Sequence, residues 1–105
     1  MISRGTNPPL TFTIPESAFC ADDIEILHIA FCQNRQLVLE KRLEDCILAG
    51  QTITVPLSET ETLRLNDRAE LEMQIRAKLK DGQKKASRIM RTEVGRILKD
   101  GELND

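Results

Sequence analysis

A chain of 105 residues, 40% of them hydrophobic and 30% charged, has the length and composition of one globular domain. Only 3% of the residues are aromatic, and none is Trp or Tyr, which leaves few rings to stack on bases or sugars. The formal net charge of −2 gives no general attraction to nucleic acid or anionic lipid, so the composition disfavours a nucleic-acid partner. No apolar run approaches the roughly 20 residues of a membrane span, and we expect no membrane partner.

The cysteines are typical of a reducing compartment. Cys20, Cys32 and Cys46 are odd in number and far apart, and they form no C-x-x-C pair, so neither a disulfide framework nor a zinc site is indicated. The first six residues also lack the apolar middle of a secretory signal. We therefore expect a cytoplasmic protein with reduced thiols.

Three strands are predicted in the first part of the chain. Residues 8–14 alternate apolar and threonine side chains, a pattern typical of a half-buried strand, and Pro15 ends it. Residues 23–32 are largely apolar on both faces, which predicts a central strand whose second face is covered. A turn at residues 33–36 leads into residues 37–41, so these two strands are predicted to form a hairpin.

The middle of the chain predicts two more strands and one helical turn. Residues 44–50 are interpreted as a connection, and residues 51–55 as the strand that follows it. Ser58 with Glu61 three residues later is a capping-box pattern, which predicts a short helical turn. Residues 69–79 alternate apolar and polar side chains without a break, as in a sheet with one solvated face, and the Asp-Gly pair that follows is a hairpin signal.

The last segment fits two different structures. Apolar residues within 86–98 recur at helical spacing, and Gly101 could cap such a helix. The Asp-Gly turn instead predicts a returning strand over residues 84–94. The pattern alone favours neither structure clearly.

Three blocks of sequence carry a resemblance: MISRGT…FTIP, then EDC…G-x-TITV, and later LEMQIR…KDGQ-x-x-AS…VG-R-x-L. On these blocks the chain resembles small proteins found in phages and prophages of clostridial gut bacteria, although residues 20–30 match less well. In the proteins it resembles, the segment that corresponds to residues 89–95 is strongly β-like, which favours a final strand. The resemblance implies a genomic setting and a fold class, and it carries no activity or catalytic motif.

Strands of this length and spacing predict an all-β fold. We expect an immunoglobulin-like, two-sheet β-sandwich of about six or seven antiparallel strands with one short helical turn. The alternative is an α+β domain with a C-terminal helix. Residues 1–105 are predicted to form this single domain, with short flexible tails at residues 1–7 and 99–105.

No catalytic, metal-binding or cofactor-binding residues are predicted, and no cofactor is expected. His28 is the only histidine, and no cluster of potential ligands surrounds it in the sequence. Cys32 lies beside Phe31 and is typical of a small core residue, because no neighbour in the sequence would lower the pKa of its thiol. We therefore expect a protein that is not an enzyme.

Two surfaces are candidates for contacts with a partner. The second face of the strand at 23–32 holds more apolar side chains than a small sandwich needs, so Ile26, His28 and Ala30 are a candidate protein interface. Basic residues gather around the predicted hairpin and form a candidate basic patch, which consists of Lys78, Lys80, Lys84, Lys85, Arg88 and Arg91. No aromatic residue lies among them, which disfavours binding to nucleic acid.

These patterns, together with the resemblance, predict a non-enzymatic structural or assembly protein of a phage or prophage. It would be a tail or head-associated virion component that acts through protein–protein contacts, with other virion proteins or with itself as a homo-oligomer. The alternative is a small binding module that recognises a host protein or nucleic acid through the basic hairpin at residues 78–91. The expected location is the cytoplasm of the bacterial host, with incorporation into a virion.

Overall fold

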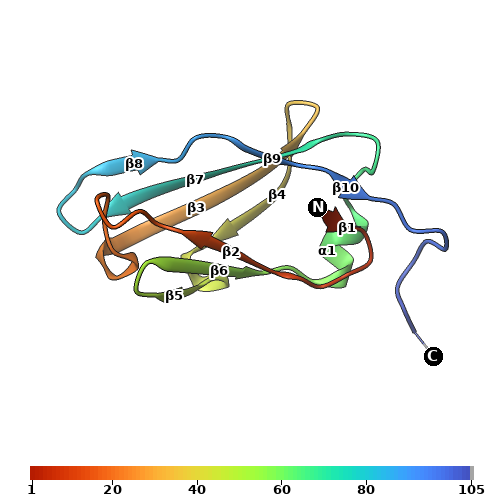
Figure 1. The fold of residues 1–105 in the computed structure, drawn as a ribbon, viewed down its shortest axis with the longest axis horizontal. Helices are drawn as coiled ribbons and strands as arrows, with labels where there is room; N and C mark the ends of the chain where they lie inside the picture. Colours follow the sequence, from red (N-terminus) through yellow and green to blue (C-terminus); the bar gives the residue numbers. More distant parts are fainter. Residues whose placement is uncertain (105) are drawn as a thin grey trace.

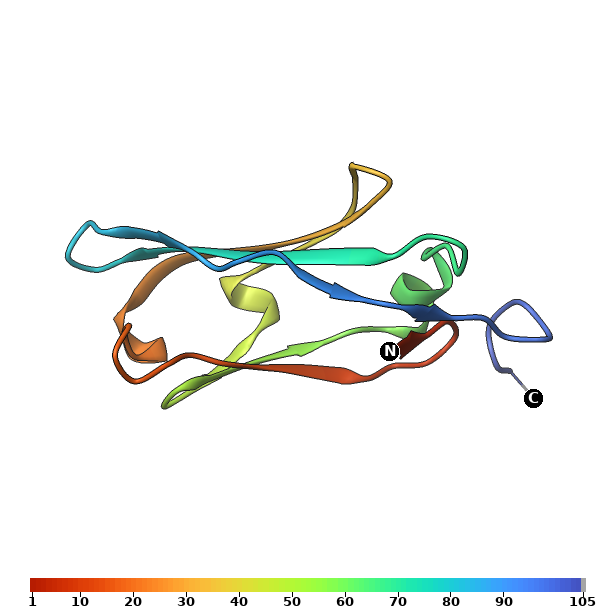
Figure 2. The ribbon, with the colours of Figure 1, turned by 45° about the horizontal axis from the view of Figure 1, so that its top comes forward.

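The chain forms two β-sheets that face each other, and a third sheet of two strands lies toward the right-hand end of the molecule (Figures 1 and 2). The structure is a computed structural model that describes residues 1–104. The strands are β1 (Ile2–Ser3), β2 (Pro9–Thr13), β3 (Ile24–Gln33), β4 (Gln36–Arg42), β5 (Ile47–Ala49), β6 (Thr52–Pro56), β7 (Leu71–Leu79), β8 (Lys84–Ala86), β9 (Met90–Thr92) and β10 (Val94–Gly95). The helical elements are α1 (Glu59–Leu63) and two 3₁₀ turns at Ala21–Asp23 and Leu43–Asp45. The expectation of an all-β chain is confirmed.

The larger sheet has the strand order β4-β3-β7-β8, and β9 pairs with β7 further along the same strand. All of these pairings are antiparallel. The alternation predicted for residues 69–79 is confirmed in β7, whose core side includes Leu71, Met73, Ala77 and Leu79. The other side of β7 is polar, which gives this sheet one face toward the core and one toward solvent.

Strand β3 is the centre of the larger sheet, between β4 and β7. Its Leu27, Ile29 and Phe31 are at most 1% exposed and form the middle of the core. A shift of register lies between Ile24 and Ile26, and Ile24 is also buried. Simple alternation predicts that Ile24 and Ile26 lie on the same face of the strand. That prediction is wrong, because the irregular residue between them reverses the side on which Ile24 points.

The smaller sheet has the order β2-β6-β5, again antiparallel. Ile53 and Val55 of β6 face the core, while its threonines face outward, as the sequence predicts. The interpretation of residues 44–50 as a connection is wrong in part, since Ile47–Ala49 form the edge strand β5. A strand of three residues is too short to show a period of two, and its pairing with β6 defines it.

The segment after the β7–β8 hairpin is extended, so the alternative of a C-terminal helix is wrong for the described chain. Strands β8 and β9 pair with β7, and β10 pairs with β1. These ladders use the backbone groups that a helix would need, and two apolar residues of the helical pattern, Ile89 and Leu98, are 46% and 92% exposed. Ser87 interrupts the pairing, because its hydroxyl accepts from the amide of Ile75 at 2.9 Å and so divides the predicted strand into β8 and β9.

Residues 1–7, which are predicted to form a flexible tail, contain β1. This strand runs parallel to β10, with Ile2 opposite Val94, and both side chains are buried. At the other end, residues 99–104 form no strand or helix, and residue 105 of the expected tail lies outside the described residues. None of the helices in residues 1–104 is long and apolar enough to cross a membrane.

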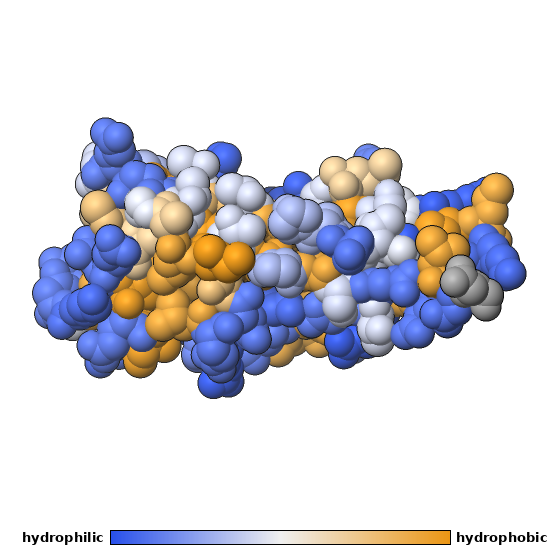
Figure 3. All heavy atoms as spheres, turned by 90° about the horizontal axis from the view of Figure 1, so that it is seen from below, coloured by the Kyte–Doolittle hydropathy of each residue, from blue (hydrophilic) through white to orange (hydrophobic). Residues whose placement is uncertain are grey.

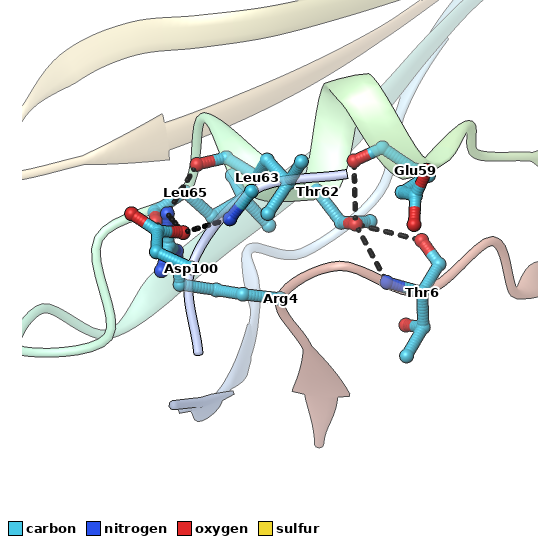
Figure 4. A network of polar contacts seen from close by, with 8 residues as sticks. Arg4, Thr6, Glu59, Thr62, Leu63, Leu65 and Asp100 are labelled. Atoms are coloured by element: carbon cyan, nitrogen blue, oxygen red, sulfur yellow. Dashed lines mark hydrogen bonds and ion pairs between the residues drawn. The ribbon is translucent and has the colours of Figure 1, made fainter. Parts of the chain in front are cut away.

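A polar network joins the N-terminal segment to the corner around α1 (Figure 4). The predicted capping box is confirmed: the Glu61 amide donates to the Ser58 hydroxyl at 3.1 Å, and the Ser58 amide donates to the Glu61 carboxylate at 2.9 Å. The guanidinium of Arg4 donates to the carbonyls of Leu63 and Leu65 at 2.7 and 2.8 Å. These carbonyls lie just at and after the end of α1, so the arginine serves as its C-terminal cap.

Candidate interaction surfaces

The predicted interface residues lie on the side of the larger sheet that is turned away from the core, which we call the outer face. Ile26, His28 and Ala30 project there from β3, and Ile26 is 45% exposed. The sequence predicts that this face is covered, but within residues 1–104 no element covers Ile26. Their neighbours in register are mostly polar or charged: Lys78, Arg76, Arg42, Gln74 and Glu40.

Charged and polar side chains lie close together on the outer face, both within β4 and between adjacent strands. Glu40 lies 3.9 Å from the Nδ1 atom of His28 and 3.5 Å from the guanidinium of Arg42. Lys78 lies 3.7 Å from Glu25, and all of these side chains are at least one-third exposed. Exposed pairs of this kind contribute little to stability, so the outer face is a largely charged, solvated surface that carries the exposed apolar side chains of Ile26 and, at the hairpin end, Leu37.

The structure divides the predicted basic patch into two groups. Lys78 and Lys84 are register partners on the outer face, so their charges repel each other directly across the strands. Arg91 lies further along this face, where it contacts Glu70 and Glu72 at 3.6 and 3.2 Å. Part of the basic patch and the predicted interface residues therefore lie on one surface, although the sequence pattern predicts two separate surfaces.

The second group of basic residues, Lys85 and Arg88, lines a cleft on another side of the molecule. This open cleft lies between β2 and β8, the edge strands of the two sheets, and has a volume of about 570 Å³. Its apolar lining includes Phe12, Phe19, Ile53, Ile75, Ala77 and Met90. The two cations are the only charged residues among those that line it. Lys80 belongs to neither group and is exposed near the hairpin turn.

The sequence does not predict the open cleft, because residues from five strands and two loops build it. One signal was present: Phe12 and Phe19 are two of only three aromatic residues, and both are only partly buried. Large apolar side chains at the rim of a core indicate an opening or a contact surface. The opening lies at this position because β2 is an edge strand. The alternation of side chains in β2 predicts a strand, but it does not indicate whether that strand lies at the edge of its sheet.

The thiol of Cys46 is not activated. Burial raises the pKa of Cys46, and the carboxylates of Asp45 and Glu44 raise it further. The Cys46 thiol donates to the carbonyl of Arg42 at 3.3 Å, and Cys20, Cys32 and Cys46 are all unbridged. In residues 1–104, no three His, Cys, Asp or Glu side chains are grouped so that they could hold a metal ion.

A second apolar area lies on the side that carries β2, β5 and β6. In Figure 3, which views the molecule from below, apolar atoms gather over the left half of this side, among polar ones. Ile47 of the edge strand β5 is 61% exposed. The smaller sheet therefore presents apolar surface outward as well as toward the core.

Comparisons with protein families, with curated proteins and with solved structures find no match for this chain. The open cleft, the outer face and the edge strands are thus the features from which its function has to be inferred.

Proposed function

We propose that this chain is a non-enzymatic structural or assembly protein that acts through protein–protein contacts. The observation that carries the proposal is the open cleft, an apolar opening of about 570 Å³ between two edge strands. Edge strands have free backbone groups on one side and readily add a strand from another chain. Apolar openings in a domain of this size are typical of contact surfaces.

The setting that we propose is a phage or prophage, in which the chain is a tail or head-associated virion component. Its resemblance to small phage and prophage proteins of clostridial gut bacteria supports this setting. Its partners would be further copies of itself or other virion proteins. It would then be made in the cytoplasm of the bacterial host and incorporated into the particle.

We also propose that the sandwich is immunoglobulin-like. In support, the order β2-β6-β5 corresponds to strands B, E and D of a variable-type immunoglobulin domain, and β8-β7-β3-β4 corresponds to G, F, C and C′. Helix α1 lies where the chain passes from β6 to β7, at the E–F corner of such a domain. The chain has no Trp or Tyr, so this is a proposal about shape alone.

A second candidate function is a binding module that recognises a host protein or nucleic acid through the basic hairpin at residues 78–91. The supporting observation is the adjacent, exposed pair Lys84 and Lys85 at the edge of the larger sheet. A partner bound in this way would dissociate as the salt concentration rises, because exposed charges are screened. The double variant Lys84→Glu/Lys85→Glu would then lose the partner.

Light scattering over a concentration series tests the proposed function. We expect a discrete oligomer whose fraction increases with concentration. The matched variants Ile26→Arg and Leu37→Arg test whether the outer face contributes. Both change exposed positions of the larger sheet, but Leu37 lies at the hairpin end of β4, away from Ile26. A chain that stays monomeric at every concentration would contradict self-assembly and would favour binding to a separate partner.

A further inference from the structure

The open cleft is chemically one-sided. Its floor is apolar, and among the described residues that line it only Lys85 and Arg88, at the β8 side, are charged. Both cations are exposed, and neither forms an ion pair within the described part of the chain. A segment that fits this surface combines apolar side chains with carboxylates.

The C-terminal tail, residues 96–104, contains both kinds of side chain, together with two cations, Arg96 and Lys99. Leu98 and Leu103 are 92% and 90% exposed, and Asp100 and Glu102 lie between them in the sequence. Figure 3 also shows apolar atoms at the right-hand end of the molecule, where the chain ends. Burying leucines that are so fully exposed is favourable, because it removes apolar surface from water.

Few contacts hold the tail against its own chain. Asp100 lies 3.0 Å from Arg4, the Thr60 hydroxyl donates to Glu102 at 3.0 Å, and the Leu103 amide donates to Glu59 at 2.9 Å. All three contacts are polar, and none of them buries a leucine side chain, although the Arg4 side chain is itself only 16% exposed. Ile97, near the start of the tail, is partly buried close to Gly5, so the part that can leave this position at little cost is residues 98–104.

The cleft and the tail lie toward opposite ends of the long axis. The molecule measures 47 × 30 × 18 Å, and the β7–β8 hairpin lies at the left-hand end of Figure 1, whereas the tail extends beyond the right-hand end. In this structure the tail is held by Arg4, Glu59 and Thr60, away from the cleft of its own chain. A second copy is therefore the natural source of the tail that fills the cleft.

We propose that the C-terminal tail of one copy binds in the open cleft of the next, with its leucines on the apolar floor and its carboxylates near Lys85 and Arg88. This inference rests on the proposed function in self-assembly and names the contact that produces it. Because the contact joins two different surfaces, it is head-to-tail, and repeating it gives a ring or an open filament.

The first test removes the apolar part of the tail. Leu98→Ser/Leu103→Ser changes two side chains that are exposed in the monomer, so the fold is unaffected. We expect the dissociation constant of self-association to rise by about 100-fold, which is the effect of losing two partly buried leucines. The control is Leu37→Ser, an exposed leucine outside the tail that should leave association unchanged.

The second test reverses the charge of the cleft. Lys85→Glu/Arg88→Glu should weaken association by about tenfold or more, because the carboxylates then meet like charges. The control, Lys80→Glu/Lys84→Glu, makes the same change of net charge on the same hairpin at residues that do not line the cleft. Association of the wild-type chain should also weaken as salt is added.

The decisive experiment mixes the two variants. Lys85→Glu/Arg88→Glu keeps a functional tail and Leu98→Ser/Leu103→Ser keeps a functional cleft, so together they can form one contact and should stop at a 1:1 dimer by light scattering. An oligomer that forms equally well in both variants would overturn the tail-in-cleft contact and leave the proposed self-assembly intact. A wild-type chain that is monomeric throughout would overturn both.

Discussion

The hydroxyl of Thr62 donates to the backbone carbonyl of Thr6 at 2.6 Å, and the amide of Thr6 donates back to the same hydroxyl at 3.1 Å. Thr62 is 1% exposed, and its oxygen also lies 3.1 Å from the carbonyl of Glu59 within α1 (Figure 4). One buried side chain thus satisfies two backbone groups of the N-terminal segment. The pair attaches the start of the chain to the corner between the sheets.

Thr62→Val keeps the shape of the side chain and removes the hydroxyl. The amide and carbonyl of Thr6 then lose their partner, so we expect the free energy of unfolding to fall by about 1–3 kcal/mol. Urea denaturation measures this change. Thr60→Val on the exposed side of the same helix is the control, and its effect should stay within about 0.5 kcal/mol. Equal losses of unfolding free energy in Thr62→Val and Thr60→Val would contradict a stabilising role of the buried pair.

Glu61 predicts a specific dependence of stability on pH. Burial alone would raise the pKa of its carboxyl, but the hydrogen bonds from Lys41 and from the Ser58 backbone outweigh burial and hold the pKa below its ordinary value of 4.5. The Lys41 ammonium lies 2.7 Å away, and both side chains are mostly buried. Because the unfolded chain takes up the proton more readily, this contribution is present above about pH 4.5 and is lost as the pH falls through the folded-state pKa.

Glu61→Gln should therefore lower the free energy of unfolding by about 1–2 kcal/mol at neutral pH, since it removes a charge-assisted hydrogen bond. The difference from wild type should shrink as the pH falls below 4.5. Urea titrations at several pH values from about pH 3 to about pH 7 measure the difference at neutral pH and its change through the acid transition. Glu16→Gln is the control at an exposed carboxylate. A difference that stays constant with pH would contradict the lowered pKa.

The hairpin between β3 and β4 offers a stabilising substitution. Its two turn residues, Asn34 and Arg35, have φ of 52° and 64°, the left-handed values that a type I′ turn requires. Such values strain a side chain like that of Arg35, so Arg35→Gly should raise the free energy of unfolding by about 0.5–1 kcal/mol. Gln36→Gly, within the strand, should instead lower it by a similar amount. Destabilisation by Arg35→Gly would mean that the arginine makes a contact worth more than this strain.

The three thiols should react at different rates. Cys20 is exposed, whereas burial and nearby carboxylates raise the pKa of Cys46 and keep its reactive thiolate scarce. Alkylation near pH 8, followed by peptide mass spectrometry, should label Cys20 first and Cys46 much more slowly. Cys20→Ala should abolish the fast phase, and Cys46→Ala should leave it unchanged. Rapid labelling of Cys46 would contradict the raised pKa.

The elements with an unambiguous local pattern were predictable. Alternation over residues 69–79 predicted β7, and Ser58 with Glu61 predicted the start of α1, because each pattern depends on neighbours in the sequence alone. The segment after residue 84 was not decided by its pattern, since its pairing partners β7 and β1 are distant in the chain. Its structure follows from long-range hydrogen bonds.

Gln33 shows why polar side chains are harder to interpret. Its sequence neighbours indicate a turn, yet it is 4% exposed, and its amide donates to the carbonyls of Asn66 and Ala69 at 2.7 and 3.0 Å. It also accepts from the Asn66 amide at 2.9 Å. Burial of an amide is acceptable only with such partners, and they lie more than thirty residues away. The open cleft was missed for the same reason, because distant segments build it.

The pairing of β1 with β10 has a consequence for the order of folding. Synthesis proceeds from the N-terminus, so Ile2 leaves the ribosome well before its partner Val94 is made. Until then Ile2 has no strand to pair with. The two facing sheets can assemble from residues 9–92 beforehand, and the parallel pair then forms as a later step that requires residues 94 and 95. A ribosome that stalls before residue 94 would hold a domain whose first strand remains open to other proteins.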